Sequence, residues 1–221
     1  MHNPLQRVVH IFLGFLYTQL AWLYDIVAGI VSLGMWQDWI ACTLPYLNGP
    51  VILELGHGPG HLQTLLVERG DVICGIDLSR QMGRLAMKNI PAVKPPLLTN
   101  GDAHYLPYKS VSFTDVVCTF PTNYITTAQV LREIKRVLIH GGQLIILPMA
   151  WIKPTRIIYR FAAWLFSITG QAPEHAQTKV TEYFVKTLSE AGFSCQTHLI
   201  DLPNSQVLLV SCDITQAGNL G

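Results

Sequence analysis

Short apolar runs alternate with longer amphipathic segments through the middle of the chain. The apolar runs cover residues 51–55, 72–77, 96–99, 113–119 and 143–149. Segments with helical spacing of apolar positions cover residues 60–69, 79–89 and 126–138. Continuous apolar runs are typical of parallel strands that are covered on both faces. The alternation of strand and helix therefore predicts an α/β fold with a doubly wound sheet.

The end of the chain follows a different pattern. A helix is predicted over residues 178–191, and Gly192 ends it because glycine readily takes the left-handed conformation of a helix C-terminus. Residues 193–200 and 206–214 are predicted as two strands of a closing antiparallel hairpin. A chain of 221 residues suffices for one core with additions, so we expect a single domain.

The first predicted strand ends at a carboxylate and breaks into a glycine-rich turn. Glu54 is followed by Gly56, Gly58 and Gly60, spaced two apart. Glycine adopts backbone angles that are closed to other residues and lets a ligand lie against the main chain. The spacing differs from the G-x-G-x-x-G of dinucleotide sites. The turn predicts a nucleoside-like ligand, and the Glu54 carboxylate is a candidate acceptor for its hydrogen bonds.

Acidic residues also follow the next two strands. Asp77 lies about twenty residues after the glycine turn, where a strand-end carboxylate meets ribose hydroxyls. Asp102 lies in the turn Gly101-Asp102-Ala103, from which we expect it to reach an adenine edge. Solvated loop carboxylates are the alternative, but their placement at successive strand ends favours a nucleoside site.

Four motifs in this order make the chain resemble the class I S-adenosylmethionine-dependent methyltransferases. The similarity is to the type 11 group, which includes enzymes of ubiquinone and menaquinone biosynthesis. The motifs are the turn at Glu54, the acid Asp77, the Gly-Asp-Ala turn with Leu-Pro after it, and the run of residues 131–142. Two positions depart from the family pattern: Glu54, where many members have Asp, and His140, where proline is frequent. The resemblance implies a Rossmann-like sheet of seven strands with the last strand antiparallel.

The resemblance also implies an enzyme that takes S-adenosyl-L-methionine as its methyl donor. It implies a cofactor site made of Tyr24, Glu54, Gly56, Gly58, Gly60, Asp77, Leu78, Met82, Asp102, Ala103 and Phe120. Met82 and Phe120 have a second interpretation as core residues, and Tyr24 as a purely structural hydrogen-bonding residue.

No catalytic residue is assigned by the sequence. Methyl transfer from a sulfonium is an in-line displacement that needs no covalent nucleophile, so positioning carries most of the catalysis. An acceptor that must lose a proton needs a base. The leading candidates are Tyr24, His61 and Tyr124, with helix capping or packing as the alternatives. Further candidates are Tyr17, Asp25, His57 and His140, the last more consistent with a structural role.

The charge balance, the cysteine pattern and the N-terminal segment predict which partners the protein has and in which compartment it lies. Lys and Arg total 15 against 14 Asp and Glu, so there is no basic field to attract nucleic acid. The five cysteines form no C-x-x-C pair, which predicts buried thiols in a reducing compartment and no metal site. No cleavable signal sequence is evident, so we expect a cytoplasmic protein.

Only 13% of the residues are charged, whereas about a quarter is usual. The apolar excess is concentrated in two segments. Residues 8–24 contain no charged side chain, and residues 151–169 place Lys153, Arg156 and Arg160 beside Trp and Phe at helical spacing. Both fit lid helices over the active site or helices at the inner membrane face, and the first also fits a membrane span. A lid that also dips into a bilayer would satisfy two of these interpretations.

We divide the methyltransferase domain, residues 1–221, into four parts. They are an N-terminal helical lid at 1–47, a cofactor-binding core at 48–150, a helical insertion at 151–175, and a C-terminal helix with a β-hairpin at 176–221. The expected reaction is methyl transfer to a small lipophilic acceptor, either a quinone precursor or a lipid headgroup. The alternatives are a soluble metabolite as acceptor, or a non-catalytic assembly partner that binds the cofactor.

Overall fold

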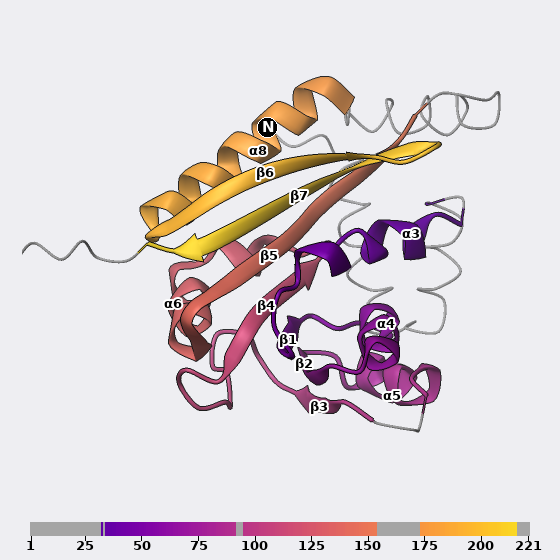
Figure 1. The fold of residues 1–221 in the computed structure, drawn as a ribbon, viewed down its shortest axis with the longest axis vertical. Helices are drawn as coiled ribbons and strands as arrows, with labels where there is room; N and C mark the ends of the chain where they lie inside the picture. The colour runs from indigo at the N-terminus through magenta and orange to yellow at the C-terminus, as the bar shows by residue number, and fades with distance from the viewer. Residues whose placement is uncertain (1–31, 33, 92–94, 154–172, 216–221) are drawn as a thin grey trace, which may run out of the picture.

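The computed structural model describes residue 32 and residues 34–91, 95–153 and 173–215. In this part of the chain seven strands form one sheet in the order β3-β2-β1-β4-β5-β7-β6 (Figure 1). Strands β1 to β5 are parallel, whereas β7 lies antiparallel between β5 and β6. The predicted Rossmann-like sheet is therefore confirmed. The strands are β1 (Val51–Leu55), β2 (Val72–Asp77), β3 (Leu97–Asn100), β4 (Phe113–Thr119), β5 (Leu138–Ile152), β6 (Phe193–Asp201) and β7 (Ser205–Ile214).

Helices cover both faces of the sheet (Figure 1). Neighbouring residues of β1 point to opposite faces, as a strand requires. Ile52 packs with Leu62 and Leu66 of α4, whereas Leu53 and Leu55 pack in a cluster with residues of α6 and α8. The helices are α3 (Trp36–Ala41), α4 (His61–Arg69), α5 (Arg80–Asn89), α6 (Ala128–Val137) and α8 (Pro173–Glu190), with short 3-10 helices η1 (Leu44–Tyr46) and η2 (Asn123–Thr126).

Strand β5 is longer than the sequence predicts. It extends from Leu138 to Ile152, not only over residues 143–149. Its last residues, Trp151 and Ile152, pair with Gln206 and Ser205 of β7. The prediction that a helix begins at Trp151 is therefore wrong, because pairing with β7 keeps the chain extended there. Residues 154–169 of that predicted helix, and the uncharged segment 8–24, lie outside the described residues.

Two of the five cysteines do not remain thiols. Cys195 of β6 and Cys212 of β7 are paired residues on adjacent antiparallel strands, and they form a disulfide. The prediction of five reduced thiols is wrong for this pair, because the hairpin brings the two side chains together on one face. Among the described cysteines, Cys74 and Cys118 are buried thiols, and Cys42 is a partly exposed one.

No helix in the described ranges has both the length and the apolarity needed to cross a bilayer.

Candidate active site

The site lies where the strand order reverses between β1 and β4. In open α/β sheets, ligands bind at this switch point, at the carboxyl ends of the strands. The loops after β1, β2, β3 and β4 all emerge at this edge because these strands are parallel. The sequence-predicted cofactor residues from 54 to 120 lie on or beside these loops, whereas Tyr24 lies outside the described residues.

The loop after β1 needs its three glycines. Gly56, Gly58 and Gly60 have φ angles of 73°, 53° and 89°, in the left-handed region that favours glycine. A side chain at Gly60 would meet Ile90 at 2.9 Å, and one at Gly56 would meet the Tyr124 hydroxyl at 2.8 Å. A side chain at Gly58 would meet nothing within 4 Å. The space beside the Gly58 Cα is therefore open, although the residue is buried and its N–H and C=O bond to Asp77 and His57.

Asp77 anchors this loop to the end of β2. Its carboxylate is 2% exposed and accepts hydrogen bonds from the backbone N–H of Gly58 at 2.9 Å and of Ser79 at 2.8 Å. The backbone N–H of Gly56 also donates to the carbonyl of Ile76 at 2.8 Å. Asp77 thus connects the glycine turn to the start of α5. Its contact with ribose hydroxyls stays a prediction.

A buried polar cluster lies beneath the glycine loop. Glu54 is 1% exposed and accepts a hydrogen bond of 2.7 Å from the Gln63 amide. Burial raises the pKa of Glu54 to about 8, an effect partly opposed by the Gln63 hydrogen bond. His57 is buried as well, and its Nδ1 donates to the Gly58 carbonyl at 2.8 Å. Burial lowers the His57 pKa, so the ring favours its neutral form.

The loop after β3 presents Asp102, whose side chain is 49% exposed. Its Oδ1 accepts hydrogen bonds from the backbone N–H of His104 at 2.9 Å and from the His104 ring at 2.6 Å. These hydrogen bonds lower the pKa of Asp102, so it stays a carboxylate. Leu78, after β2, is 72% exposed, whereas Met82 is fully buried in α5. Leu78 therefore offers exposed apolar surface, whereas Met82 packs inside the protein, and its contact with adenine stays a prediction.

The loop after β4 brings aromatic side chains to the same edge. Phe120 has a φ of 48° and stacks on Trp36 of α3, with ring centroids 4.4 Å apart. The Tyr124 hydroxyl donates to the Leu55 carbonyl at 3.2 Å and contacts the Cys118 sulfur at 3.1 Å. Tyr124 thereby links the ends of β1 and β4 beside Gly56.

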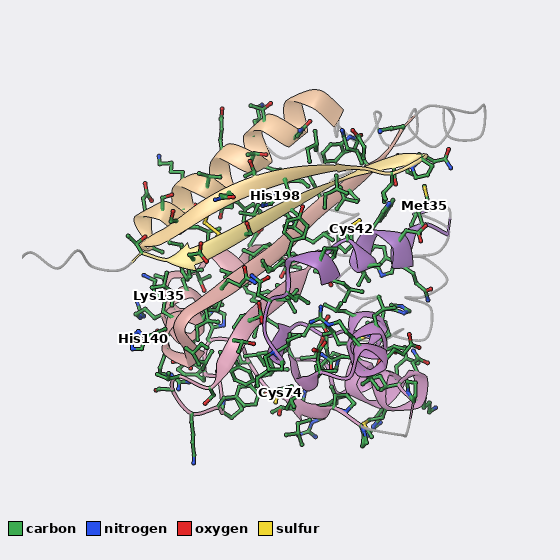
Figure 2. The ribbon with its side chains drawn as sticks, viewed as in Figure 1. Met35, Cys42, Cys74, Lys135, His140 and His198 are labelled. Carbon is green, nitrogen blue, oxygen red and sulfur yellow. A yellow bond between two sulfur atoms is a disulfide. The ribbon has the colours of Figure 1, made fainter. Side chains whose placement is uncertain are left out.

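The remaining base candidates lie in different places. His61 is the first residue of α4 and is partly exposed. His140 is exposed on the first part of β5, where Figure 2 shows it projecting from the molecule near α6. Because the site is formed at the carboxyl ends of the strands, His140 is at the wrong end of β5 to act in it.

Three residues that the sequence did not single out help to build the site. They are Trp36 against Phe120, Gln63 against Glu54, and His104 against Asp102. The sequence did hold a signal for position 104, because an Asp side chain often accepts from the backbone N–H two residues on in an Asx turn. Trp36 had none, because its contact depends on how α3 packs on the sheet.

A cleft of about 290 Å³ opens beside these loops, between η2, β5 and α8. Its walls are mostly apolar, and the Thr126 and Tyr183 hydroxyls share a hydrogen bond of 2.8 Å. The lining residues are Pro121, Thr122, Asn123, Ile125, Thr126, Pro148, Met149, Lys179, Val180, Tyr183 and Phe184. The cleft joins the loop after β4, so it adjoins the predicted cofactor loops.

Comparison with known proteins decides the family. A family described as a methyltransferase domain matches residues 53–146. A demethylmenaquinone methyltransferase from Thermotoga maritima is 30% identical, with 80% of this chain and 86% of that protein covered. Another, from Lactobacillus johnsonii, is 35% identical, with 85% and 80% covered. This chain belongs to the type 11 family of S-adenosylmethionine-dependent methyltransferases.

The fold agrees with this family. A candidate S-adenosyl-L-methionine-dependent methyltransferase from Methanococcus maripaludis superposes with a TM-score of 0.63 at 20% identity, covering 90% of this chain and 94% of that one. Membership of the family makes the chain an S-adenosylmethionine-dependent enzyme, as the sequence predicted, and the structural likeness shows the shared fold.

The described residues fit the methyl donor of this methyltransferase family. The lack of a side chain at Gly58 leaves open space beside the turn. Asp102 is an exposed carboxylate, and a carboxylate is an acceptor for the amine of an adenine ring. Leu78 supplies exposed apolar surface after β2. Backbone, acceptor and apolar surface are the groups that an adenosyl ligand requires.

Proposed function

We propose that this methyltransferase transfers the methyl group of S-adenosyl-L-methionine to a small lipophilic acceptor with a quinone-type ring. The observation that carries the proposal is the naming of two relatives, at 30% and 35% identity, as demethylmenaquinone methyltransferases. Both alignments extend well beyond the cofactor core, which is the part that methyltransferases of different substrates share.

The apolar cleft supports a lipophilic acceptor. Its volume of about 290 Å³ is near the lower end of small-molecule sites, so a single ring system is a suitable occupant. Ile125, Val180 and Phe184 provide apolar contacts, while Thr126 and Tyr183 provide hydroxyls for the polar edge of a ring. A lipid headgroup, which is charged and strongly hydrated, matches these walls less well.

The protein contributes to catalysis mainly by positioning. When bound, S-adenosyl-L-methionine supplies a methyl group on a positively charged sulfur. Holding two reactants in attack geometry is worth on the order of 7 to 11 kcal/mol. Tyr124 has its hydroxyl hydrogen directed to the Leu55 carbonyl, which favours a role in holding the glycine loop over a role as base.

Transfer of labelled methyl groups tests the acceptor class. The purified protein is incubated with labelled S-adenosyl-L-methionine and, separately, with a demethylmenaquinol, phosphoethanolamine or a total cell extract. We expect label in the organic phase with the quinol. Label only with phosphoethanolamine would favour a lipid headgroup, and label confined to aqueous products of the extract would favour a soluble metabolite. Tight cofactor binding without transfer to any acceptor would favour a non-catalytic role.

A variant of the cleft tests where the acceptor binds. Val180→Phe places a larger side chain in the cleft, so we expect a raised KM for the quinol and unchanged affinity for S-adenosyl-L-methionine. Lys186→Phe is the matched control, because the Lys186 side chain is 78% exposed on the same helix and does not line the cleft. Equal KM values in the two variants would place the acceptor elsewhere.

A further inference from the structure

The imidazole of His104 bridges two loops at the cofactor edge of the sheet. Its Nδ1 lies 2.6 Å from Asp102 Oδ1, and its Nε2 lies 3.2 Å from the hydroxyl of Thr127, the N-cap residue of α6. The backbone N–H of His104 donates to the same Asp102 oxygen at 2.9 Å. The loop after β3 is thereby joined to the start of α6 through one side chain.

The hydroxyl of Thr127 is oriented by its other contacts. It donates its hydrogen to the Tyr124 carbonyl at 2.9 Å, and it accepts from the Val130 N–H at 3.4 Å. A hydroxyl has one hydrogen and two lone pairs, so Thr127 faces His104 with a lone pair. The imidazole is held in one orientation by acceptors on both sides.

The backbone N–H and the ring Nδ1 of His104 both form hydrogen bonds with the same oxygen of Asp102. Oδ1 therefore has its lone pairs engaged, whereas no described residue donates to Oδ2. With Oδ1 held from two directions, the carboxylate cannot rotate without losing a charge-assisted hydrogen bond. The side chain is 49% exposed, so Oδ2 remains an acceptor for a ligand that carries an N–H donor.

The surrounding loop does not depend on His104 for its fold. Glu133 of α6 accepts from the Leu106 N–H at 2.8 Å, and Arg136 donates to the Leu106 carbonyl at 2.9 Å. Gln129 donates to the backbone carbonyl of His104 at 3.1 Å, a contact that any residue at position 104 retains. The imidazole therefore contributes to the orientation of Asp102 more than to the attachment of the loop.

We propose that His104 is a positioning residue for adenine recognition. It holds the Asp102 carboxylate so that Oδ2 accepts a hydrogen bond from the exocyclic amine of the adenosyl group. The inference rests on the cofactor site proposed for Asp102, and it is independent of the identity of the methyl acceptor. Among exposed histidines of the chain, His140 offers a control because it lies at the other end of the sheet.

The test compares two ligands that differ at the adenine amine. Calorimetry measures the Kd of S-adenosylhomocysteine and of its analogue with an unsubstituted purine base, which has hydrogen in place of the exocyclic amine. We expect the wild-type protein to prefer the adenosyl ligand by at least about tenfold, because a hydrogen bond to a charged group is lost with the purine ligand. His104→Ala should reduce this preference several-fold, and His140→Ala should leave it unchanged.

A conservative variant separates positioning from folding. The amide nitrogen of Asn overlays the Nδ1 of His, so His104→Asn should restore most of the preference that His104→Ala loses. Thermal melts confirm that each variant is folded. An unchanged preference in folded His104→Ala would overturn the inference, as would equal binding of the two ligands by the wild type. Binding of neither ligand would overturn the cofactor assignment itself, whereas failure with the quinol acceptor alone would leave this measurement intact.

Discussion

Glu54, Asp77 and Asp102 follow one another at the ends of neighbouring strands, yet each carboxylate has different partners. Asp77 is held by two backbone N–H groups, Asp102 by His104, and Glu54 by the Gln63 amide in a buried position. The pKa of Glu54 is raised, because burial penalises its charged form more than the single amide bond favours it. The three residues all lie near the carboxyl ends of strands, but their electrostatic environments differ.

The raised pKa of Glu54 makes stability depend on pH. A group whose pKa is higher in the folded state contributes stability that is fully present below its unfolded value, near 4.5, and is lost as the pH rises through about 8. Urea denaturation measures the free energy of unfolding at pH 5 and at pH 8. Between these pH values it should fall by up to about 3 kcal/mol more in the wild type than in Glu54→Gln. Parallel pH dependence in the two proteins would contradict a buried, protonated Glu54.

At the scale of elements, local sequence pattern determines the bounds of some strands, and pairing with a neighbouring strand determines those of others. Strands β1, β2 and β4 match their predicted bounds because a short run rich in apolar residues defines each of them. Strand β5 exceeds its predicted bounds at both ends, since its extra carboxyl-terminal residues are extended by pairing with Ser205, Gln206 and Val207 of β7. Helix α8 begins at Pro173, earlier than predicted, and proline is well suited to a first helical turn.

The hairpin of β6 and β7 carries a prediction about its disulfide. Unreduced, denatured protein should expose three reactive thiols, those of Cys42, Cys74 and Cys118. The disulfide joins residues 17 positions apart, and its restriction of the unfolded chain stabilises the fold by about 3 kcal/mol. Reductant should therefore lower the free energy of unfolding by about that amount. The double variant Cys195→Ala, Cys212→Ala should not respond to reductant. Titration of five thiols would show that the disulfide does not form.

At the scale of the whole molecule, low charge remains the most unusual property. With 13% charged residues, the surface carries fewer ionic groups than is usual for a protein in water, where about a quarter of residues are charged. Residues 8–24 carry no charged side chain, and residues 151–169 carry only basic ones among apolar residues; both segments lie mostly outside the described residues. Contact of these segments with a membrane surface stays a proposal, and it is suited to an enzyme whose acceptor is lipophilic.

Co-sedimentation with vesicles that contain anionic phospholipid tests this proposal on the full chain. We expect the protein to sediment with the vesicles, and Arg156→Gln with Arg160→Gln to weaken binding by roughly 1 kcal/mol per removed charge. The matched control is Arg84→Gln with Lys88→Gln, which removes two exposed charges from α5 and should leave binding unchanged. Full-length protein that stays in the supernatant would exclude the membrane interpretation.

The sequence by itself determined the doubly wound sheet, the position of the glycine turn and the family, because these follow from local patterns. Period and composition define the strands, and the φ angles of Gly56, Gly58 and Gly60 follow from a turn that only glycine tolerates. The tertiary structure decided which groups meet across the sheet: Gln63 with Glu54, and His104 with Thr127. Such contacts depend on how helices dock and strands register, and no local pattern encodes these distances.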